Sequence, residues 1–239
     1  MLQISNKIYC DDMFKNMYIE NKIFTNPYYD FPYLVIKNFL SKKLSKEIVS
    51  FIKESNDYKK AQVIVNESSI TKGKLKEEFR KTNIYKLNEI YENIYKNRFD
   101  EIKPLIEKYF NLILTNSTHI QVLEYTKGCY YKKHADDSSE IVDHNGNTVA
   151  FKNVNIERKI STVLFASEFQ NTLKNNSSFN GGELKFNYLY DENEKQIEFK
   201  PSYGDLIVFP SNPIFSHEIL KVQDGYRLTL VQWHDAIIN

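Results

Sequence analysis

The spacing of apolar residues divides the chain into a helical N-terminal part and a strand-rich C-terminal part. In the first 116 residues, runs of apolar side chains recur at every third or fourth position, as in amphipathic helices. From residue 117 the apolar period shortens to two, which is typical of strands that turn alternate side chains to opposite faces of a sheet. We therefore expect N-terminal helices to support a C-terminal β core.

Three helical patterns are present in the N-terminal part. One helix is predicted over about residues 44–55, with a serine able to cap it. Two more patterns cover residues 84–95 and 102–112, and Pro104 would fall in the first turns of the last helix, where proline is tolerated. The first 33 residues end in a proline-containing aromatic segment and are predicted to form an extended arm. A short strand and turn follow at residues 33–40.

The C-terminal part is predicted to contain eight strands, separated by turn signals rich in Gly, Asn and Asp. The expected strands are residues 118–126, 129–136, 159–168, 182–190, 195–200, 205–210, 216–222 and 226–235. This number of short strands fits a double-stranded β-helix, also called a jelly roll or cupin-like fold. We expect an α+β, mainly β class and one domain over residues 1–239. Residues 1–116 would form the arm and supporting helices, and residues 117–239 the core.

Two longer segments interrupt the strand pattern. Residues 170–180 are predicted to be a polar loop, and residues 137–158 follow directly after a possible metal-binding pair. Long loops in compact domains are usually lids, binding loops or solvated insertions. For residues 137–158 we favour a lid, and a solvated insertion is the alternative.

Composition narrows the class of partner. The chain has 32 basic and 31 acidic residues, a formal charge of +1, which argues against a polyanion held by bulk electrostatics. We expect no nucleic-acid partner and no membrane partner. Cys10 and Cys129 are far apart and do not form a disulfide framework. The N-terminus lacks the apolar run of a signal peptide, so a cytoplasmic location is expected.

Candidate chemistry is concentrated at His134 and Asp136. In a strand, residues two apart point to the same face, so an imidazole and a carboxylate would lie side by side. His217 is the best candidate for a third ligand. Two histidines and one carboxylate with open positions opposite are typical of non-haem Fe(II) oxygenases. A His-x-Asp pair alone is weak, because such pairs are common on protein surfaces.

A second candidate lies on the last predicted strand, where Arg227, Thr229, Val231 and Trp233 share one face. If this face points inward, Arg227 is a guanidinium inside the barrel. A buried guanidinium needs an anion, and its planar fork suits a carboxylate. The alternative is a salt bridge to an internal acidic residue.

Further segments follow in an order that carries a family resemblance. They are Pro32 to Ser41, Arg80-Lys-Thr82, Tyr125 with Gly128, Tyr131, His134-Ala-Asp136, Arg158 to Phe165, Gly181-Gly182-Glu183-Leu184, Pro201 with Gly204-Asp205, Phe209-Pro210, His217, Gly225-Tyr-Arg227 and Trp233. Over about residues 31–235 the sequence resembles the 2-oxoglutarate/Fe(II)-dependent dioxygenase superfamily, in its prolyl 4-hydroxylase-like branch.

The resemblance implies that His134, Asp136 and His217 bind Fe(II) and that Arg227 binds the distal carboxylate of 2-oxoglutarate. It also implies O2 as cosubstrate, and ascorbate is a further candidate. The implied reaction is hydroxylation of an unactivated C–H bond, with a prolyl residue of a protein or peptide, or a free amino acid, as substrate. A halogenating relative would need the Asp136 position vacated for chloride, so hydroxylation is favoured.

The resemblance also implies a hydroxyl that assists cosubstrate binding. Tyr125 is the first candidate, and Thr162 and Thr229 are weaker ones. Where some relatives place a tyrosine beside the cosubstrate carboxylate, this chain has Phe165.

Two other functions were weighed. One is a non-catalytic cupin-like module, or a degenerate oxygenase, that binds metal or 2-oxoglutarate. The other is a nucleic-acid dealkylase. The dealkylase is disfavoured because such relatives carry a second arginine six residues after the first, where this chain has Trp233.

Overall fold

The computed structural model describes residues 3–5, 7–15, 17, 32–61, 63–67, 70–74 and 78–238. The helices are α1 (Asp12–Lys15), α2 (Lys42–Glu54), α3 (Glu89–Phe110) and the short 3-10 helix η1 (Pro213–Phe215). The strands are β1 (Gln3–Ser5), β2 (Ile8–Cys10), β3 (Leu34–Ile36), β4 (Tyr58–Lys60), β5 (Val63–Glu67), β6 (Ile70–Lys74), β7 (Arg80–Lys81), β8 (Asn83–Tyr85), β9 (Leu112–Ser117), β10 (Gln121–Thr126), β11 (Tyr130–His134), β12 (Ser138–Val142), β13 (Thr148–Asn153), β14 (Ile160–Phe165), β15 (Glu168–Phe169), β16 (Ser178–Gly181), β17 (Leu184–Tyr190), β18 (Gln196–Phe199), β19 (Leu206–Pro210), β20 (His217–Ile219) and β21 (Val222–Ile238).

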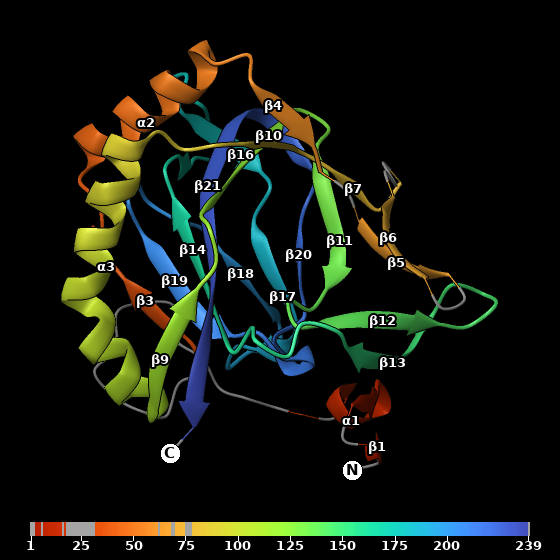
Figure 1. Cartoon of the computed structure of the whole chain (residues 1–239). Helices are drawn as coiled ribbons and strands as arrows, with labels where there is room; N and C mark the ends of the chain where they lie inside the picture. Colours follow the sequence, from red (N-terminus) through yellow and green to blue (C-terminus); the bar gives the residue numbers. More distant parts are fainter. Residues whose placement is uncertain are drawn as a thin grey trace.

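Two sheets form the core of the molecule (Figure 1). The larger sheet has the order β3-β19-β14-β21-β10-β8-β4, with β9 and β16 also paired to β21. The smaller sheet has the order β18-β17-β20-β11-β7. This is the predicted mainly β jelly roll with helices on one side, and the eight strands expected after residue 117 are all present.

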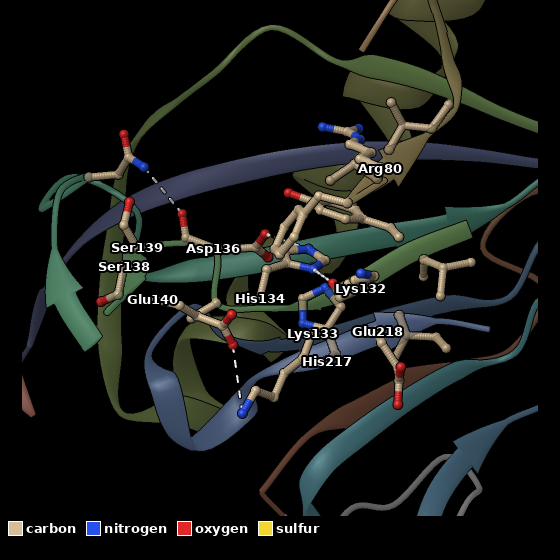
Figure 2. Close-up of a pocket in the computed structure, with 18 of the residues that line it drawn as sticks. Arg80, Lys132, Lys133, His134, Asp136, Ser138, Ser139, Glu140, His217 and Glu218 are labelled. Carbon is tan, nitrogen blue, oxygen red and sulfur yellow. Dashed lines mark hydrogen bonds and ion pairs between the residues drawn. The ribbon is translucent and has the colours of Figure 1, made fainter. Parts of the chain in front are cut away.

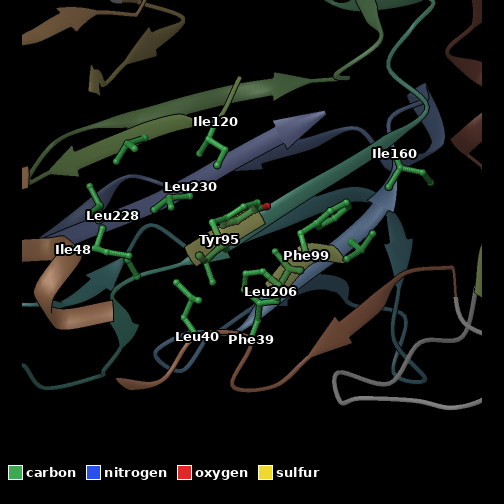
Figure 3. Packing of buried hydrophobic residues seen from close by; sticks show 14 of the residues in the cluster. Phe39, Leu40, Ile48, Tyr95, Phe99, Ile120, Ile160, Leu206, Leu228 and Leu230 are labelled. Atoms are coloured by element: carbon green, nitrogen blue, oxygen red, sulfur yellow. The ribbon is translucent and has the colours of Figure 1, made fainter. Parts of the chain in front are cut away.

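Helices α2 and α3 cover the outer face of the larger sheet (Figure 1). Tyr95 and Phe99 from α3 pack there with Leu228 and Leu230 from β21, as Figure 3 shows. Burial of each such side chain contributes roughly 1.5–3 kcal/mol, so this layer fixes the helices against the sheet. None of the helices in the described ranges is long and apolar enough to cross a membrane.

Helix α2 agrees with its predicted range to within two residues, but its cap differs. Ser41, not Ser45, is the N-cap, and its Oγ accepts from the Leu44 backbone N–H at 3.2 Å. Ser45 lies one turn further on and is buried in the helix with Ile48. The cap satisfies one of the N–H groups that the first turn leaves without a partner.

The prediction of two helices around Pro104 is wrong. Helix α3 is continuous from its Asn88 cap to Asn111, whose φ of 51° ends it in the left-handed region. Pro104 is exposed in the interior of this helix, although its ring removes one backbone hydrogen bond there. The apolar positions before and after the helix belong to β8 and β9.

Residues 137–158, for which a lid was favoured, contain the hairpin β12–β13. Its strand β13 also pairs with β2, in the register Ala150–Cys10 and Phe151–Tyr9, so that the chain start forms a sheet β1-β2-β13-β12. Figure 1 shows this hairpin beside β11 and above α1. Most of the predicted N-terminal arm, residues 18–31, lies outside the described residues.

The first 116 residues also supply strands to the core. Strands β3, β4, β8 and β9 belong to the larger sheet, and β7 belongs to the smaller one. A close approach secures β3 next to the turn before β19. Gly204 has φ +74°, and a Cβ there would lie 1.8 Å from the Leu40 carbonyl oxygen, so this position requires glycine.

Candidate metal centre

The pairing of β11 with β20 brings together two histidines that are far apart in sequence. His134 lies directly opposite His217, with ring centroids 4.3 Å apart. Asp136 follows just after the end of β11 and is buried. One ligand atom from each of the three residues lies within 4.8 Å of the other two (Figure 2). The geometry therefore assembles the three candidate ligands named from the sequence.

Backbone carbonyls fix which nitrogen of each imidazole is available. The Nδ1 of His134 lies 2.9 Å from the Lys132 carbonyl, and the Nδ1 of His217 lies 3.0 Å from the Phe215 carbonyl. A carbonyl can only accept, so both Nδ1 atoms donate a hydrogen bond, which leaves both Nε2 atoms as the possible metal-binding atoms. Burial, followed by the neighbouring His217, lowers the pKa of His134 to about 3. A neutral imidazole is the form that binds a metal.

The carboxylate of Asp136 is held in its ionised form. Burial by itself acts to raise the pKa of Asp136, but His217, His134 and the Ser161 hydroxyl outweigh it and keep that pKa below its usual range. Ser161 Oγ donates to Oδ2 at 2.6 Å, while Oδ1 lies 3.9 Å from His134 Nε2. One carboxylate oxygen is thus held by the protein, and the other faces the two imidazoles.

Arg227 is 1% exposed and is surrounded by aromatic rings. Its guanidinium carbon lies 4.9 Å from the ring centroid of Tyr125, 5.2 Å from Phe165 and 5.8 Å from Phe179. Nη1 donates weakly to Thr229 Oγ1 at 3.4 Å, and among the described residues Nε and Nη2 have no hydrogen-bond partner. Burial lowers the pKa of Arg227 to about 10, which leaves it charged at neutral pH. Such a group needs an anionic ligand.

Residues 120–235 match the sequence model of the 2OG-Fe(II) oxygenase superfamily, and this range contains all three candidate ligands and Arg227. This segment is similar in sequence to that superfamily. None of the curated proteins matches the sequence.

Solved structures with the same fold are prolyl hydroxylases. A Pseudomonas putida prolyl-4-hydroxylase is 19% identical with a TM-score of 0.56, covering 85% of this chain and 92% of its own. A Trichoplax adhaerens prolyl hydroxylase, solved with a hypoxia inducible factor peptide fragment, is 18% identical (TM-score 0.58, 85% and 83% covered). A viral collagen prolyl hydroxylase from Paramecium Bursaria Chlorella virus-1, solved with 2OG, is 17% identical (TM-score 0.55, 86% and 96% covered). At these identities the likeness shows that the chain shares the fold of these enzymes.

Oxygenases of this superfamily use Fe(II), 2-oxoglutarate and O2. The residues present fit both resident groups. Two neutral imidazoles and one carboxylate suit Fe(II). The unpartnered Arg227 guanidinium, in the same cavity, suits the carboxylate of a 2-oxo acid.

The other residues predicted for the oxygenase site are divided between the two faces of the larger sheet. Tyr125 and Thr229 line the cavity with Arg227, as expected. Thr162, the other hydroxyl candidate, does not line this cavity. Its Oγ1 lies 3.0 Å from the Gln232 carbonyl and 3.1 Å from His234 Nε2, on the face covered by the helices. Alternation along β14 explains this, because Ser161 and Val163 face the cavity instead.

His234 is structural, as predicted from its parity relative to Trp233. Its ring is stacked on Phe99 with a centroid distance of 4.5 Å. Nδ1 lies 2.7 Å from Ser117 Oγ, so both ring nitrogens have protein partners.

A cleft of about 1420 Å³ leads to the candidate metal centre. Tyr131 stacks on His134 with ring centroids 3.5 Å apart, and the guanidinium carbon of Arg158 lies 3.9 Å from the Trp233 ring. Arg158 Nη1 also donates to the backbone carbonyl of Asp136 at 3.1 Å. The cleft therefore has an aromatic wall next to the candidate ligands.

The family resemblance includes Arg158, Ser161 and Tyr131, but the sequence alone indicates no role for them. Ser161 shares a strand face with Val163, but β14 is buried on both faces, so alternation alone does not show which face meets the cavity. For Arg158 and Tyr131 the contacts depend on tertiary packing that spacing does not reveal.

Proposed function

We propose that the protein is an Fe(II)/2-oxoglutarate-dependent dioxygenase that hydroxylates an unactivated C–H bond of a prolyl residue in a protein or peptide, or of a free amino acid. The observation that carries the proposal is the buried guanidinium of Arg227, which has two donors without partners in the cavity that also contains His134, Asp136 and His217. A metal-binding module alone does not need this second anion site.

In the proposed enzyme, Nε2 of His134, Nε2 of His217 and Oδ1 of Asp136 hold Fe(II). Ser161 keeps the other oxygen of Asp136 oriented through its 2.6 Å hydrogen bond. When bound, the metal and 2-oxoglutarate supply the oxidising chemistry that activates O2 and the substrate C–H bond.

Arg227 pairs with the distal carboxylate of 2-oxoglutarate in this proposal. The rings of Tyr125, Phe165 and Phe179 exclude water from the pair, which strengthens the attraction between the two charges. Thr229, whose Oγ1 lies 3.4 Å from Nη1, helps to orient the guanidinium.

Two observations favour a prolyl residue of a peptide over a free amino acid. The cleft of about 1420 Å³ exceeds the roughly 300–1,000 Å³ that is usual for small-molecule sites. Trp233, in its wall, offers an aromatic surface against which a pyrrolidine ring can pack. The Trichoplax protein with the same fold was solved with a peptide fragment.

Anaerobic titration of the purified protein with Fe(II) and 2-oxoglutarate tests the cofactor part. We expect the weak visible metal-to-ligand charge-transfer band in wild type and its loss in Asp136→Ala. If neither the band nor a rise in melting temperature is observed, the protein is a binding module of another kind.

Succinate release in air tests the substrate part. Peptides with a central proline should stimulate it, whereas the same peptides with alanine in that place should not. If a broad panel of proline peptides and free amino acids gives no stimulation, the substrate class is wrong even where the band forms.

A further inference from the structure

The cleft above the proposed centre is rich in cationic side chains, although the whole chain is nearly neutral. Apart from Arg227 and Asp136, the described lining residues include seven cations and two carboxylates, Glu140 and Glu218. The cations are Lys59, Lys60, Arg80, Lys132, Lys133, Lys152 and Arg158. Figure 2 shows Arg80, Lys132 and Lys133 grouped around His134. The positive charge is therefore local to the cleft.

Both carboxylates of the lining already face a lysine. Glu140 Oε1 lies 3.7 Å from Lys133 Nζ, and Glu218 Oε1 lies 3.3 Å from Lys185 Nζ. In contrast, Lys59 and Lys152 are exposed and form no ion pair within the described part of the chain. Among the described residues, Lys133 is therefore paired with Glu140 and Asp11, whereas no acidic group pairs with Lys59 or Lys152.

Arg80 shows that this charge is part of a built site. Its side chain is 9% exposed and lines the cleft, and its guanidinium carbon lies 4.5 Å from the Tyr131 ring. Nε of Arg80 has no hydrogen-bond partner among the described residues, and no carboxylate there pairs with it. A nearly buried, unpaired guanidinium is costly unless a ligand supplies the anion.

We propose that the cleft selects a substrate peptide with acidic side chains close to the reacting residue, and that one of these carboxylates binds Arg80. This inference rests on the proposed function and names the class of its substrate. Tyr131 lies between the two sites, since its ring is 3.5 Å from His134 and 4.5 Å from the Arg80 guanidinium. An extended peptide rises about 3.3 Å per residue, so the acidic side chain lies roughly two or three residues from the reacting one.

Discrete carboxylates fit the cleft better than a nucleic-acid backbone. Glu140 and Glu218 interrupt the cationic wall and would repel a continuous row of phosphates. A peptide can place individual carboxylates at Arg80 and at the lysines while its other residues pass the two glutamates.

The test uses three peptides with the same central proline, flanked by Asp and Glu, by Asn and Gln, or by Lys. Succinate release gives KM and kcat for each. We expect the acidic peptide to have a KM at least about tenfold lower than the amide peptide, and we expect added KCl to reduce the difference. The same preference should appear in anaerobic binding of fluorescent peptides, which does not require turnover.

Variants locate the effect. Lys59→Glu/Lys152→Glu should raise KM for the acidic peptide and lower it for the lysine peptide, and Arg80→Gln should remove most of the acidic preference. The control is Lys43→Glu, an exposed lysine on α2, which covers the opposite face of the larger sheet. This control should behave as wild type with all three peptides.

Equal KM values for acidic and amide peptides would overturn the inference while leaving the proposed function intact. Tighter binding of a single-stranded oligonucleotide that displaces the acidic peptide would also overturn it, in favour of a nucleic-acid substrate. Absence of the charge-transfer band, in contrast, would refute the proposed function itself, and the inference would fall with it.

Discussion

Replacement of Arg227 by methionine should have opposite effects on the ligand-free protein and on 2-oxoglutarate binding. The methionine side chain is similar in length and apolar, and it would lie among the rings of Tyr125, Phe165 and Phe179. It removes a charge that has two donors without partners in the described part of the molecule.

The magnitudes follow from burial. Burial lowers the pKa of Arg227 from 12.5 to about 10, which corresponds to an unfavourable free energy of about 3 kcal/mol for the charged form in the ligand-free protein. Relief of this cost would raise Tm by roughly 5–10 °C in a domain of this size. Loss of a buried charge-assisted pair with the cosubstrate costs about 2–5 kcal/mol, which weakens 2-oxoglutarate binding by at least about 30-fold.

The assay is thermal unfolding of wild type and Arg227→Met under anaerobic conditions with Fe(II), with and without 2-oxoglutarate. Wild type should start at the lower Tm and rise on addition of 2-oxoglutarate, whereas the variant should start higher and stay unchanged. Lys108→Met removes an exposed cation at the end of α3 and serves as the control. A variant that is less stable than wild type without ligand, or that keeps the full 2-oxoglutarate shift, would show that Arg227 has another partner and does not bind the cosubstrate.

Four further outcomes are expected. Asp136→Ala should abolish Fe(II) binding in anaerobic titration; retained binding would mean that the metal is held elsewhere. Ser161→Ala should weaken Fe(II) binding about 10–100-fold because Oδ2 of Asp136 loses its hydrogen bond. The neighbouring Thr162→Val should instead lower unfolding free energy by about 1–3 kcal/mol and leave Fe(II) affinity unchanged, and equal effects of the two variants would contradict the assignment of faces. Gly204→Ala should lower unfolding free energy by more than about 3 kcal/mol in chemical denaturation, since its Cβ would collide with the Leu40 carbonyl oxygen; wild-type stability would show that the turn can shift.

Where the position of a side chain depends only on alternation along its strand, the sequence was sufficient to predict that position. The parity of the last strand correctly placed Arg227 and Thr229 at the cavity and His234 on the opposite face. On β14 the same alternation did not show which face Thr162 occupies, because residues Ile160–Phe165 are buried on both faces of that strand. A strand buried on both faces has no polar side to set its orientation.

Features that depend on distant partners could not be predicted from spacing. The hairpin β12–β13 has strands of mixed polar and apolar residues, and its pairing with β2 joins segments about 140 residues apart in the chain. His217 was proposed as a ligand from its residue type and the family resemblance, because nothing local to it indicates the pairing with β11. Pro104 was over-interpreted, since tertiary packing of Ile106 and Tyr109 maintains the helix beyond it.

The hairpin β12–β13 has a consequence for how this enzyme can diverge. The candidate metal ligands lie on or next to strands β11 and β20, whereas β12 and β13, which line the cleft, are secured by the first residues of the chain through β2. The reaction centre and the substrate wall therefore depend on different parts of the sequence. We expect changes near the N-terminus to affect β12 and β13 more than the candidate ligands on β11 and β20. Accordingly, a protein shortened to begin at Pro32 would keep the complete ligand set but lose the strand that supports its substrate wall.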